Sequence, residues 1–359
     1  MENYVVSARK YRPKRFEDVV GQTHVTQTLQ KAIEQNHLAQ ALLFTGPRGV
    51  GKTTCARILA KMINAQDQAG TDAENDFAFN IFELDAASNN SVDDIRNLTD
   101  QVRFAPQVGR FKVYIIDEVH MLSKAAFNAF LKTLEEPPAH AIFILATTER
   151  HQILPTILSR CQIYDFKRIT VDDIARHLAY VAVNEHIEAD PSALHLIAQK
   201  ADGALRDSLS IFDRIATYSG NKISYQDVIE NLNILDYEYY FRIVESALSN
   251  QISELLITYN DILDRGFDGQ LFVNGLAAHL RDLLVAKDPR TVALLEIGGG
   301  LKERYHEQVA KLGYKELFSS LEVLNNADLH YKASSNPRLL VELALLELGK
   351  ILSGEKKKP

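Results

Sequence analysis

A glycine-rich segment, Gly46-Pro47-Arg48-Gly49-Val50-Gly51-Lys52-Thr53, has the residue types and spacing of a phosphate-binding loop. It fits G-x-x-x-x-G-K-[ST] and lies between a short apolar run and a helical pattern, the context that this motif requires. The glycines allow successive N–H groups to point at phosphate oxygens, and the following helix adds partial positive charge. We expect Lys52 to reach the β- and γ-phosphates and the Thr53 hydroxyl to bind Mg²⁺. The next residue, Thr54, is a further nucleotide-binding candidate.

A second segment, Val113-Tyr114-Ile115-Ile116-Asp117-Glu118, is a buried apolar run that ends in two carboxylates. We expect the strand to deliver Asp117 to its carboxyl end, where it can hold the water shell of Mg²⁺. Glu118 is suited to polarise an attacking water. The two segments together predict hydrolysis of a nucleoside triphosphate at its γ-phosphate.

The elements that must position these residues alternate between strand-like runs and helical periods over the first ~165 residues, which is typical of a parallel α/β sheet. From about Thr170 the strand signals fade and the patterns become helical. We therefore predict a nucleotide-binding domain over 1–168, a small helical domain over 169–235 and a second, all-helical domain over 236–353. The last residues, 354–359, are expected to be a linker stump.

Composition limits the function classes. The 359 residues carry 40 Lys and Arg against 47 Asp and Glu, a net charge of −7, which argues against a uniformly basic coat for nucleic acid but not against a local basic patch. No apolar run reaches the ~18 residues that a membrane span needs, and the N-terminus lacks a signal-peptide pattern. The two cysteines, Cys55 and Cys161, fit a reducing cytoplasm and cannot form a four-thiolate zinc site.

Three further side chains are candidates with two interpretations each. Thr148 follows a buried strand and could contact the γ-phosphate or its water, although a threonine there is often only a turn former. Arg160 could complete a neighbouring subunit's site, or be a surface charge. Arg206 opens a helix and could reach back to the nucleotide, or be a solvated charge.

Several longer motifs extend the pattern, and together they resemble the AAA+ ATPases and, within them, the tau/gamma family of bacterial DNA polymerase III clamp-loader subunits. The resemblance is dense over residues 4–215 and looser, as a helical pattern, to about 350. The motifs are Ala8-Arg9-Lys10-Tyr11-Arg12-Pro13, Phe16-Glu17-Asp18-Val19-Val20-Gly21-Gln22, Glu83-Leu84-Asp85-Ala86-Ala87-Ser88, Asp117-Glu118-Val119-His120-Met121-Leu122, Asn128-Ala129-Phe130-Leu131-Lys132-Thr133-Leu134-Glu135-Glu136-Pro137-Pro138 and Ile157-Leu158-Ser159-Arg160-Cys161.

The resemblance implies a fold and a set of residue roles. The fold is an AAA+ P-loop domain with a parallel sheet, then a helical lid domain and an all-helical collar that forms oligomers. The family's ATP site falls on the phosphate loop, Asp117 and Glu118. Its sensor 1 falls on Thr148, its trans-acting arginine finger on Arg160 and its sensor 2 on Arg206. The segment that flanks the adenine supplies Ala8, Arg12, Pro13 and Val20.

The resemblance also implies partners. The family forms a pentameric ring of tau/gamma, delta and delta-prime subunits, which opens and holds the beta sliding clamp when ATP binds. Primed DNA then triggers hydrolysis and release of the closed clamp. Enzyme classifications attach the holoenzyme's DNA-directed DNA polymerase (nucleotidyltransferase) activity to this subunit, but nothing here resembles a polymerase palm, so we assign only the ATPase. Arg96, Lys124 and Lys132 are DNA-contact candidates, although a charged side chain at such positions is more often only a solvated charge.

The chain departs from the family pattern between the phosphate-loop helix and Glu83-Leu84-Asp85-Ala86-Ala87-Ser88. The family usually carries a four-cysteine zinc module there, whereas residues 64–80 are short and contain no cysteine, so we expect no zinc. The extended C-terminus of tau is also absent, which predicts a gamma-like or shortened chain. Two other hypotheses remain open: another AAA+ machine, such as a branch-migration motor or a recombination-associated ATPase, and a scaffold that binds ATP without hydrolysing it.

Overall fold

The structure, a computed structural model, describes residues 5–65, 80–107, 109–292, 295 and 299–354. Its contacts divide the chain into two compact units, Met1–Lys222 and Ile223–Pro359. The three-domain boundaries given above stay predictions.

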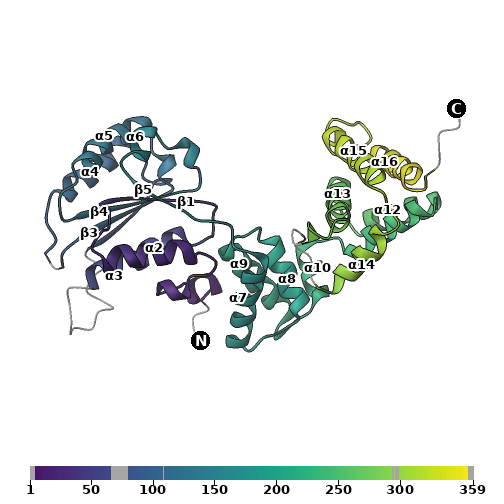
Figure 1. Cartoon of the computed structure of the whole chain (residues 1–359), viewed down its shortest axis with the longest axis horizontal. Coiled ribbons are helices and arrows are strands. Elements are labelled where there is room, and N and C mark those ends of the chain that lie inside the picture. The colour runs from purple at the N-terminus through teal and green to yellow at the C-terminus, as the bar shows by residue number, and fades with distance from the viewer. Residues whose placement is uncertain (1–4, 66–79, 108, 293–294, 296–298, 355–359) are drawn as a thin grey trace. The chain divides into compact units, whose positions relative to one another are not determined.

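The first unit is built on a five-stranded parallel sheet in the order β2-β3-β4-β1-β5 (Figure 1). Each strand connects to the next through a helical segment, which is the connection that parallel neighbours require. The predicted parallel α/β sheet is therefore confirmed. Its strands are β1 (Ala41–Thr45), β2 (Ile81–Asp85), β3 (Lys112–Asp117), β4 (Ala141–Thr147) and β5 (Gln162–Asp165).

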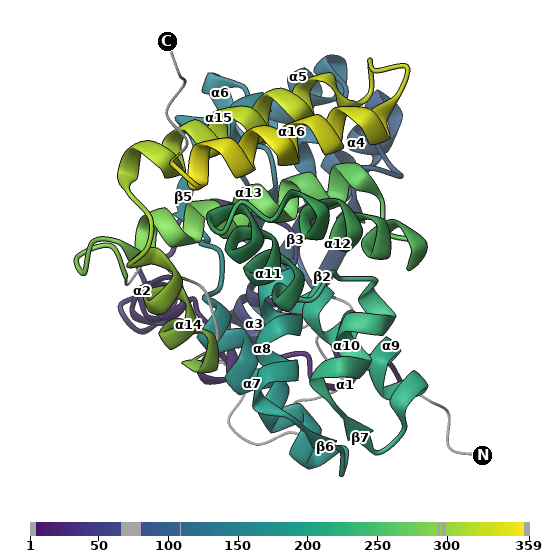
Figure 2. The ribbon, with the colours of Figure 1, turned by 90° about the vertical axis from the view of Figure 1, so that its right-hand side faces the viewer.

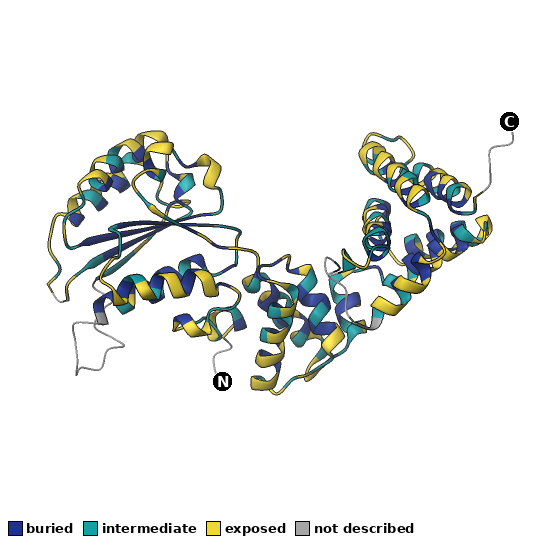
Figure 3. Ribbon diagram, viewed as in Figure 1, coloured by how far each residue is buried: buried dark blue, intermediate teal, exposed yellow. Residues whose placement is uncertain are grey.

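Both faces of the three central strands, β3, β4 and β1, are buried, because alternate side chains of each strand enter different cores. In β1, Leu42 and Phe44 pack with α2 (Thr23–Glu34) and α3 (Lys52–Ala65). On the other face Leu43 packs with α4 (Val92–Val102), α5 (Lys124–Glu135) and α6 (Pro155–Leu158). Figure 3 shows the strands as a buried band between these two helical layers. A sheet covered on both faces leaves its carboxyl edge as the place for a ligand.

Short polar signals set where the helices of this layer begin. Ser91 caps α4 in a reciprocal box with Asp94, and the Ser123 hydroxyl accepts from the Ala126 N–H at the start of α5. The remaining short elements of the sheet domain are α1 (Ser7–Lys10), η1 (Phe16–Asp18), η3 (Val119–Met121) and η4 (Arg150–Gln152).

Three helices follow the sheet within the first unit: α7 (Val171–Asn184), α8 (Pro191–Lys200) and α9 (Leu205–Ser219). Thr170 caps α7 by accepting from the Asp173 N–H, and Pro191 occupies the first position of α8. The helical pattern did not indicate the two-residue strands β6 (Glu188–Ala189) and β7 (Lys222–Ile223), which pair in a small second sheet.

Apart from Ile223, which ends β7, the regular elements in the described residues of the second unit are helices, and α11 to α16 share an apolar core. Figure 2 shows α15 and α16 side by side, and both pack with α13. No helix in the described part of the chain combines the length and the apolar character that crossing a membrane would require. The helices of this unit are α10 (Tyr225–Leu232), α11 (Tyr237–Leu248), α12 (Ile252–Asp264), α13 (Gly269–Ala286), α14 (Gly299–Val309), α15 (Tyr314–Tyr331) and α16 (Pro337–Leu352).

Candidate nucleotide-binding site

The carboxyl ends of the central strands meet at one edge of the sheet. Thr45 of β1 lies opposite Thr147 of β4, and the Gly46 N–H donates to the Thr147 carbonyl across 3.3 Å. Asp117 ends β3, the neighbour of β4. Strand pairing therefore brings the glycine-rich loop after β1 next to the carboxylates after β3.

The loop has a backbone that only glycine adopts easily. Gly46, Gly49 and Gly51 have φ values of +140°, +75° and +104°. A Cβ on Gly46 would lie 2.3 Å from the Phe166 carbonyl oxygen, and one on Gly49 would lie 2.9 Å from the Ala204 Cβ. The loop is thus closely packed against later parts of the chain, and α3 starts directly from it at Lys52. This is the cradle of N–H groups and helix N-terminus that phosphate binding uses.

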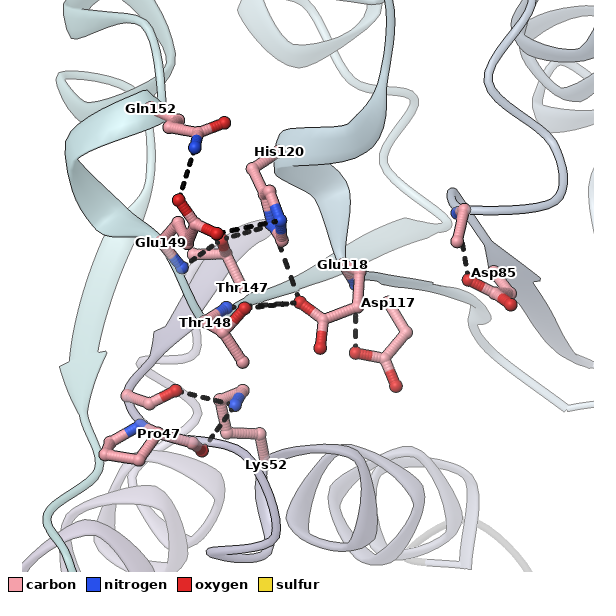
Figure 4. A network of polar contacts seen from close by, with 12 residues as sticks. Pro47, Lys52, Asp85, Asp117, Glu118, His120, Thr147, Thr148, Glu149 and Gln152 are labelled. Atoms are coloured by element: carbon pink, nitrogen blue, oxygen red, sulfur yellow. Dashed lines mark hydrogen bonds and ion pairs between the residues drawn. The ribbon is translucent and has the colours of Figure 1, made fainter. Parts of the chain in front are cut away.

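Lys52 is buried inside its own loop. Its ammonium donates to the carbonyl oxygens of Gly46 and Pro47, each across 2.7 Å (Figure 4). Burial lowers the pKa of this ammonium, while the neighbouring Glu118 and Asp117 carboxylates act in the opposite direction. A buried cation at the start of the helix suits a polyphosphate ligand.

The two residues predicted to hold Mg²⁺ are in direct contact. The Thr53 hydroxyl donates to Asp117 Oδ2 across 2.6 Å, and Asp117 Oδ1 accepts from the Glu118 N–H across 3.0 Å. A hydroxyl and a carboxylate are hard oxygen donors of the kind that Mg²⁺ prefers. The residues at this position therefore fit the predicted ion.

Glu118 belongs to a polar network at the ends of β3 and β4 (Figure 4). Its Oε2 accepts from the Thr148 N–H across 3.2 Å and from the Thr148 hydroxyl across 3.0 Å. The structure thus brings Thr148 to the Glu118 carboxylate. It also adds His120, whose Nδ1 lies 3.5 Å from the same oxygen. Sequence analysis gave His120 no role of its own, although it lies two residues after Glu118 within the motif Asp117-Glu118-Val119-His120-Met121-Leu122.

A pocket of about 160 Å³ lies over the loop and collects residues from distant parts of the first unit. It includes all four predicted adenine-flanking residues, Ala8, Arg12, Pro13 and Val20, and the predicted sensor residue Arg206. The Arg206 N–H also donates to the Gly49 carbonyl across 3.4 Å. The remaining lining residues are Tyr11, Val19, Arg48, Gly49, Val50, Gly51, Lys52, Thr53, Thr54, Asp117, Glu118, Ile169, Leu205 and Leu209.

Five of these lining residues were not predicted: Tyr11, Val19, Ile169, Leu205 and Leu209. They supply mainly apolar surface, as a nucleobase site needs. The second unit has a larger open depression of about 1020 Å³, but most of its charged side chains pair with one another, as Arg304 does with Glu238 at 2.7 Å. We therefore place the functional site at the smaller pocket, where the phosphate loop lies.

The N-terminal segment that lines the pocket is tied to the helices after the sheet. The Ser7 N–H donates to Asp213 Oδ2 of α9 across 2.8 Å, and the Ser7 hydroxyl contacts the same carboxylate across 2.5 Å. Glu185, just after α7, accepts from the Tyr11 hydroxyl and pairs with Lys10 at 2.6 Å. Burial and this hydrogen bond raise the pKa of Tyr11 above its usual range, and the Lys10 and Tyr11 donors lower that of Glu185. We call these contacts the α1 clasp.

Arg160 lies apart from the pocket lining described above, on the turn between α6 and β5. Its guanidinium donates to Glu135 Oε1 across 2.5 Å and to the Thr156 carbonyl across 2.7 Å. The side chain is about one-third exposed. Its role in a neighbouring subunit's site stays a prediction.

The DNA-contact candidates are exposed on two neighbouring helices, Arg96 on α4 and Lys124 and Lys132 on α5. Arg96 lies 3.4 Å from Asp93, one turn before it. Most of the segment in which the family carries its zinc module, residues 66–79, lies outside the described residues. The expected absence of zinc and the DNA contacts therefore stay predictions.

Two family models match the chain. The model described as "DNA polymerase III, delta subunit" matches residues 21–170, which span the sheet. The model described as "DNA polymerase III clamp loader subunit, ATPase lid domain" matches residues 173–221, which span α7 to α9. The segments that line the pocket thus fall largely within two matched regions.

A solved structure shares the fold. RuvB from Thermotoga maritima, a Holliday junction branch migration motor, is 20% identical, with a TM-score of 0.50 over 84% of this chain and 92% of that one. This identity is low enough that the likeness shows the fold alone. The predicted AAA+ fold is confirmed.

Curated relatives match over almost the whole chain. DNA polymerase III subunit tau of Bacillus subtilis is 40% identical over 96% of this chain and 63% of the relative. The corresponding subunit tau of Salmonella typhimurium is 37% identical over 96% of this chain and 55% of the relative, so the chain spans little more than half the length of these tau subunits. DNA polymerase III subunit gamma of Buchnera aphidicola is 32% identical over 96% of this chain and 99% of the relative. The chain belongs to the tau/gamma family of DNA polymerase III clamp-loader subunits.

Proposed function

We propose that this chain is the ATP-hydrolysing motor subunit of a clamp loader, which places a sliding clamp on primed DNA during replication. The observation that carries the proposal is the meeting of Lys52, Thr53, Asp117 and Glu118 at the sheet edge, with Thr53 and Asp117 only 2.6 Å apart. A scaffold that only binds nucleotide would not need a second carboxylate, Glu118, beside the Mg²⁺ ligands.

Each residue has a separate task in this proposal. The loop N–H groups and the Lys52 ammonium bind the β- and γ-phosphates, and Thr53 and Asp117 hold Mg²⁺. When bound, Mg²⁺ offsets the phosphate charge. Glu118 takes a proton from the attacking water, and Thr148 orients the Glu118 carboxylate for this step. Ala8, Arg12, Pro13 and Val20 enclose the adenine, and Arg206 links α9 to the bound nucleotide.

The assembly is part of the proposal. Further copies of this chain, delta and delta-prime subunits form a pentameric cytoplasmic ring with it, which binds the beta clamp and primed DNA. In that ring Arg160 of one subunit offsets charge on the γ-phosphate held by the next. The match to a family model described as a DNA polymerase III delta subunit and the relatives named tau and gamma support this set of partners. The polymerase activity belongs to other subunits of the holoenzyme.

The test compares ATP binding and hydrolysis in three chains. Lys52→Ala should lose tight ATP binding, because the charge facing the phosphates is gone. Glu118→Gln should still bind ATP, since Thr53 and Asp117 remain, but hydrolysis should fall by about 10²-fold or more. A Gln variant that hydrolyses ATP at the parental rate would exclude Glu118 as the base.

The activating ligand separates the alternatives. A clamp loader should hydrolyse ATP faster when the clamp and primed DNA are both added. A branch-migration motor should respond to branched DNA instead, and a scaffold should bind ATP without turnover under either condition. The matched control is the Lys52→Ala chain assembled with the same partners.

A further inference from the structure

A buried histidine, His120, lies between two carboxylates at the carboxyl edge of the sheet. Its Nδ1 is 3.5 Å from Glu118 Oε2, and its Nε2 is 3.8 Å from Glu149 Oε1. Nδ1 also shares a hydrogen bond of 3.0 Å with the Thr147 hydroxyl. The imidazole is only 7% exposed, so packing and these contacts hold it in one orientation.

The backbone explains why His120 reaches this position. Glu118 is in the left-handed region, with φ +47° and ψ +45°, which is uncommon for a residue with a side chain. The Met121 N–H then donates to the Glu118 carbonyl across 2.8 Å and closes a tight turn. The turn brings the side chains of Glu118 and His120 together over the end of β4 (Figure 4). Such strained geometry concentrates at functional sites.

Glu118 is held through one oxygen. Its Oε2 receives both Thr148 donors and faces His120, whereas Figure 4 shows the other carboxylate oxygen pointing to the side on which Lys52 and Asp117 lie. A carboxylate anchored at one oxygen presents the other in a defined direction. For a general base, that direction governs proton transfer far more than it governs ligand binding.

We propose that His120 is a positioning residue for Glu118. Together with Thr148, His120 fixes the Glu118 carboxylate so that its free oxygen faces the attacking water. The inference rests on the proposed ATPase function. It predicts that a change at His120 lowers kcat and leaves ATP affinity nearly unchanged. A purely structural histidine would affect both together through misfolding, or neither.

Two substitutions separate the contacts of the two imidazole nitrogens of His120. Asparagine places an amide nitrogen near the position of Nδ1, and glutamine places one near that of Nε2. His120→Asn should keep the Thr147 and Glu118 side of the network. His120→Gln should keep only the Glu149 side, and His120→Ala should lose both. His151 is the matched control, since its Nε2 lies 3.6 Å from Glu149 Oε2 but its side chain is 79% exposed.

The experiment measures kcat and KM for ATP in the full chain assembled with its partner subunits, and the Kd of a fluorescent ATP analogue. We expect His120→Ala to lower kcat about tenfold, equivalent to about 1.4 kcal/mol, with KM and Kd within about twofold of the parental values. His120→Asn should recover most of that loss, and His151→Ala should match the parent. A His120→Asn chain that is as slow as His120→Gln, or a loss confined to Kd, would overturn the proposal.

A double-mutant cycle distinguishes this failure from failure of the proposed function. The free energy of unfolding is measured for His120→Ala, Glu118→Ala and the double variant, and we expect the two changes to be non-additive. Additivity would mean that the residues do not interact, which overturns the positioning role even if ATP is hydrolysed. Non-additivity in a chain with no ATPase activity would retain the contact and reject the proposed function. If His120→Ala unfolds, His120→Gln replaces it in the cycle, because it also loses the Glu118 side of the network, and non-additivity with Glu118→Ala is again expected.

Discussion

The Thr53 hydroxyl donates a 2.6 Å hydrogen bond to Asp117 Oδ2, joining the first turn of α3 to the end of β3. The two residues lie 64 positions apart in the sequence. Their contact places a hydroxyl and a carboxylate, both hard oxygen donors, at the edge where β1 and β3 end. We therefore predict that hydrolysis depends on Mg²⁺.

Thr53→Ala should raise the Mg²⁺ concentration needed for half-maximal hydrolysis and lower the maximal rate by about tenfold or more, because one of the two ion-binding side chains is lost. Titration of Mg²⁺ at saturating ATP measures both effects. Thr53→Ser keeps the hydroxyl and is the control. The prediction is wrong if the Ala and Ser variants give the same Mg²⁺ curve.

Arg160→Ala should leave ATP affinity of the isolated chain unchanged, because the residue lies outside the lining of its own pocket. In the assembled ring, hydrolysis should fall by about 10³-fold, the contribution typical of a trans-acting arginine. Arg150→Ala is the control, since Arg150 is a half-exposed arginine of the same domain that pairs with Asp165 at 3.1 Å.

Mixing Arg160→Ala chains with Lys52→Ala chains tests whether the arginine acts in trans. One chain supplies an intact phosphate loop and the other an intact arginine, so mixed rings should regain part of the activity. A residue that acts on its own subunit could not be rescued in this way. Mixed rings that assemble normally but stay as inactive as both parents would exclude the trans role.

Loss of the α1 clasp should weaken nucleotide binding. Glu185→Ala removes the acceptor of Tyr11 and the ion-pair partner of Lys10, which frees the segment that carries Ala8 and Arg12 into the pocket. We expect the Kd for ATP to rise about two- to tenfold, in line with the net contribution of one or two hydrogen bonds. Glu188→Ala is the control, because Glu188 forms an exposed ion pair with Lys222. Equal Kd values for the two variants would show that the clasp does not support the pocket.

His279 should make the second unit less stable in mild acid. It is buried in the helical core, where Nδ1 bonds with the Tyr305 hydroxyl at 2.8 Å and Nε2 with Gln308 Oε1 at 2.9 Å. Burial lowers its pKa from 6.5 to about 4. A depressed folded-state pKa means that the unfolded chain binds more protons, so stability is full above pH 6.5 and falls as the pH drops toward 4.

The full effect of His279 corresponds to about 3 kcal/mol, at 1.36 kcal/mol for each pKa unit. Urea unfolding of the second unit, followed between pH 7 and pH 4.5, measures this loss. His279→Phe removes the titrating group, so its free energy of unfolding should depend less steeply on pH, whatever its value at pH 7. An unchanged slope would mean that other groups carry the acid sensitivity.

The sequence by itself determined the phosphate loop, the Asp117-Glu118 pair and the order of strands and helices around them. These features follow from local spacing: glycines where φ must be positive, apolar runs where strands are buried on both faces, and polar caps where helices begin. Because parallel strands bring their carboxyl ends to one edge, the meeting of Thr53 and Asp117 also followed from the order of the elements.

Only the tertiary structure decided which distant residues hold the pocket-lining segments in place. Ser7 meets Asp213 and Tyr11 meets Glu185 across 206 and 174 positions of chain, and no local pattern encodes such pairs. The role proposed for His120 likewise depends on the left-handed conformation of Glu118 and on the neighbouring end of β4. Local propensity governs which helix or strand forms, whereas long-range contacts arise from the packing of whole elements against one another. The side chains of Ser7, Tyr11 and His120 therefore acquire their partners only when that packing is complete.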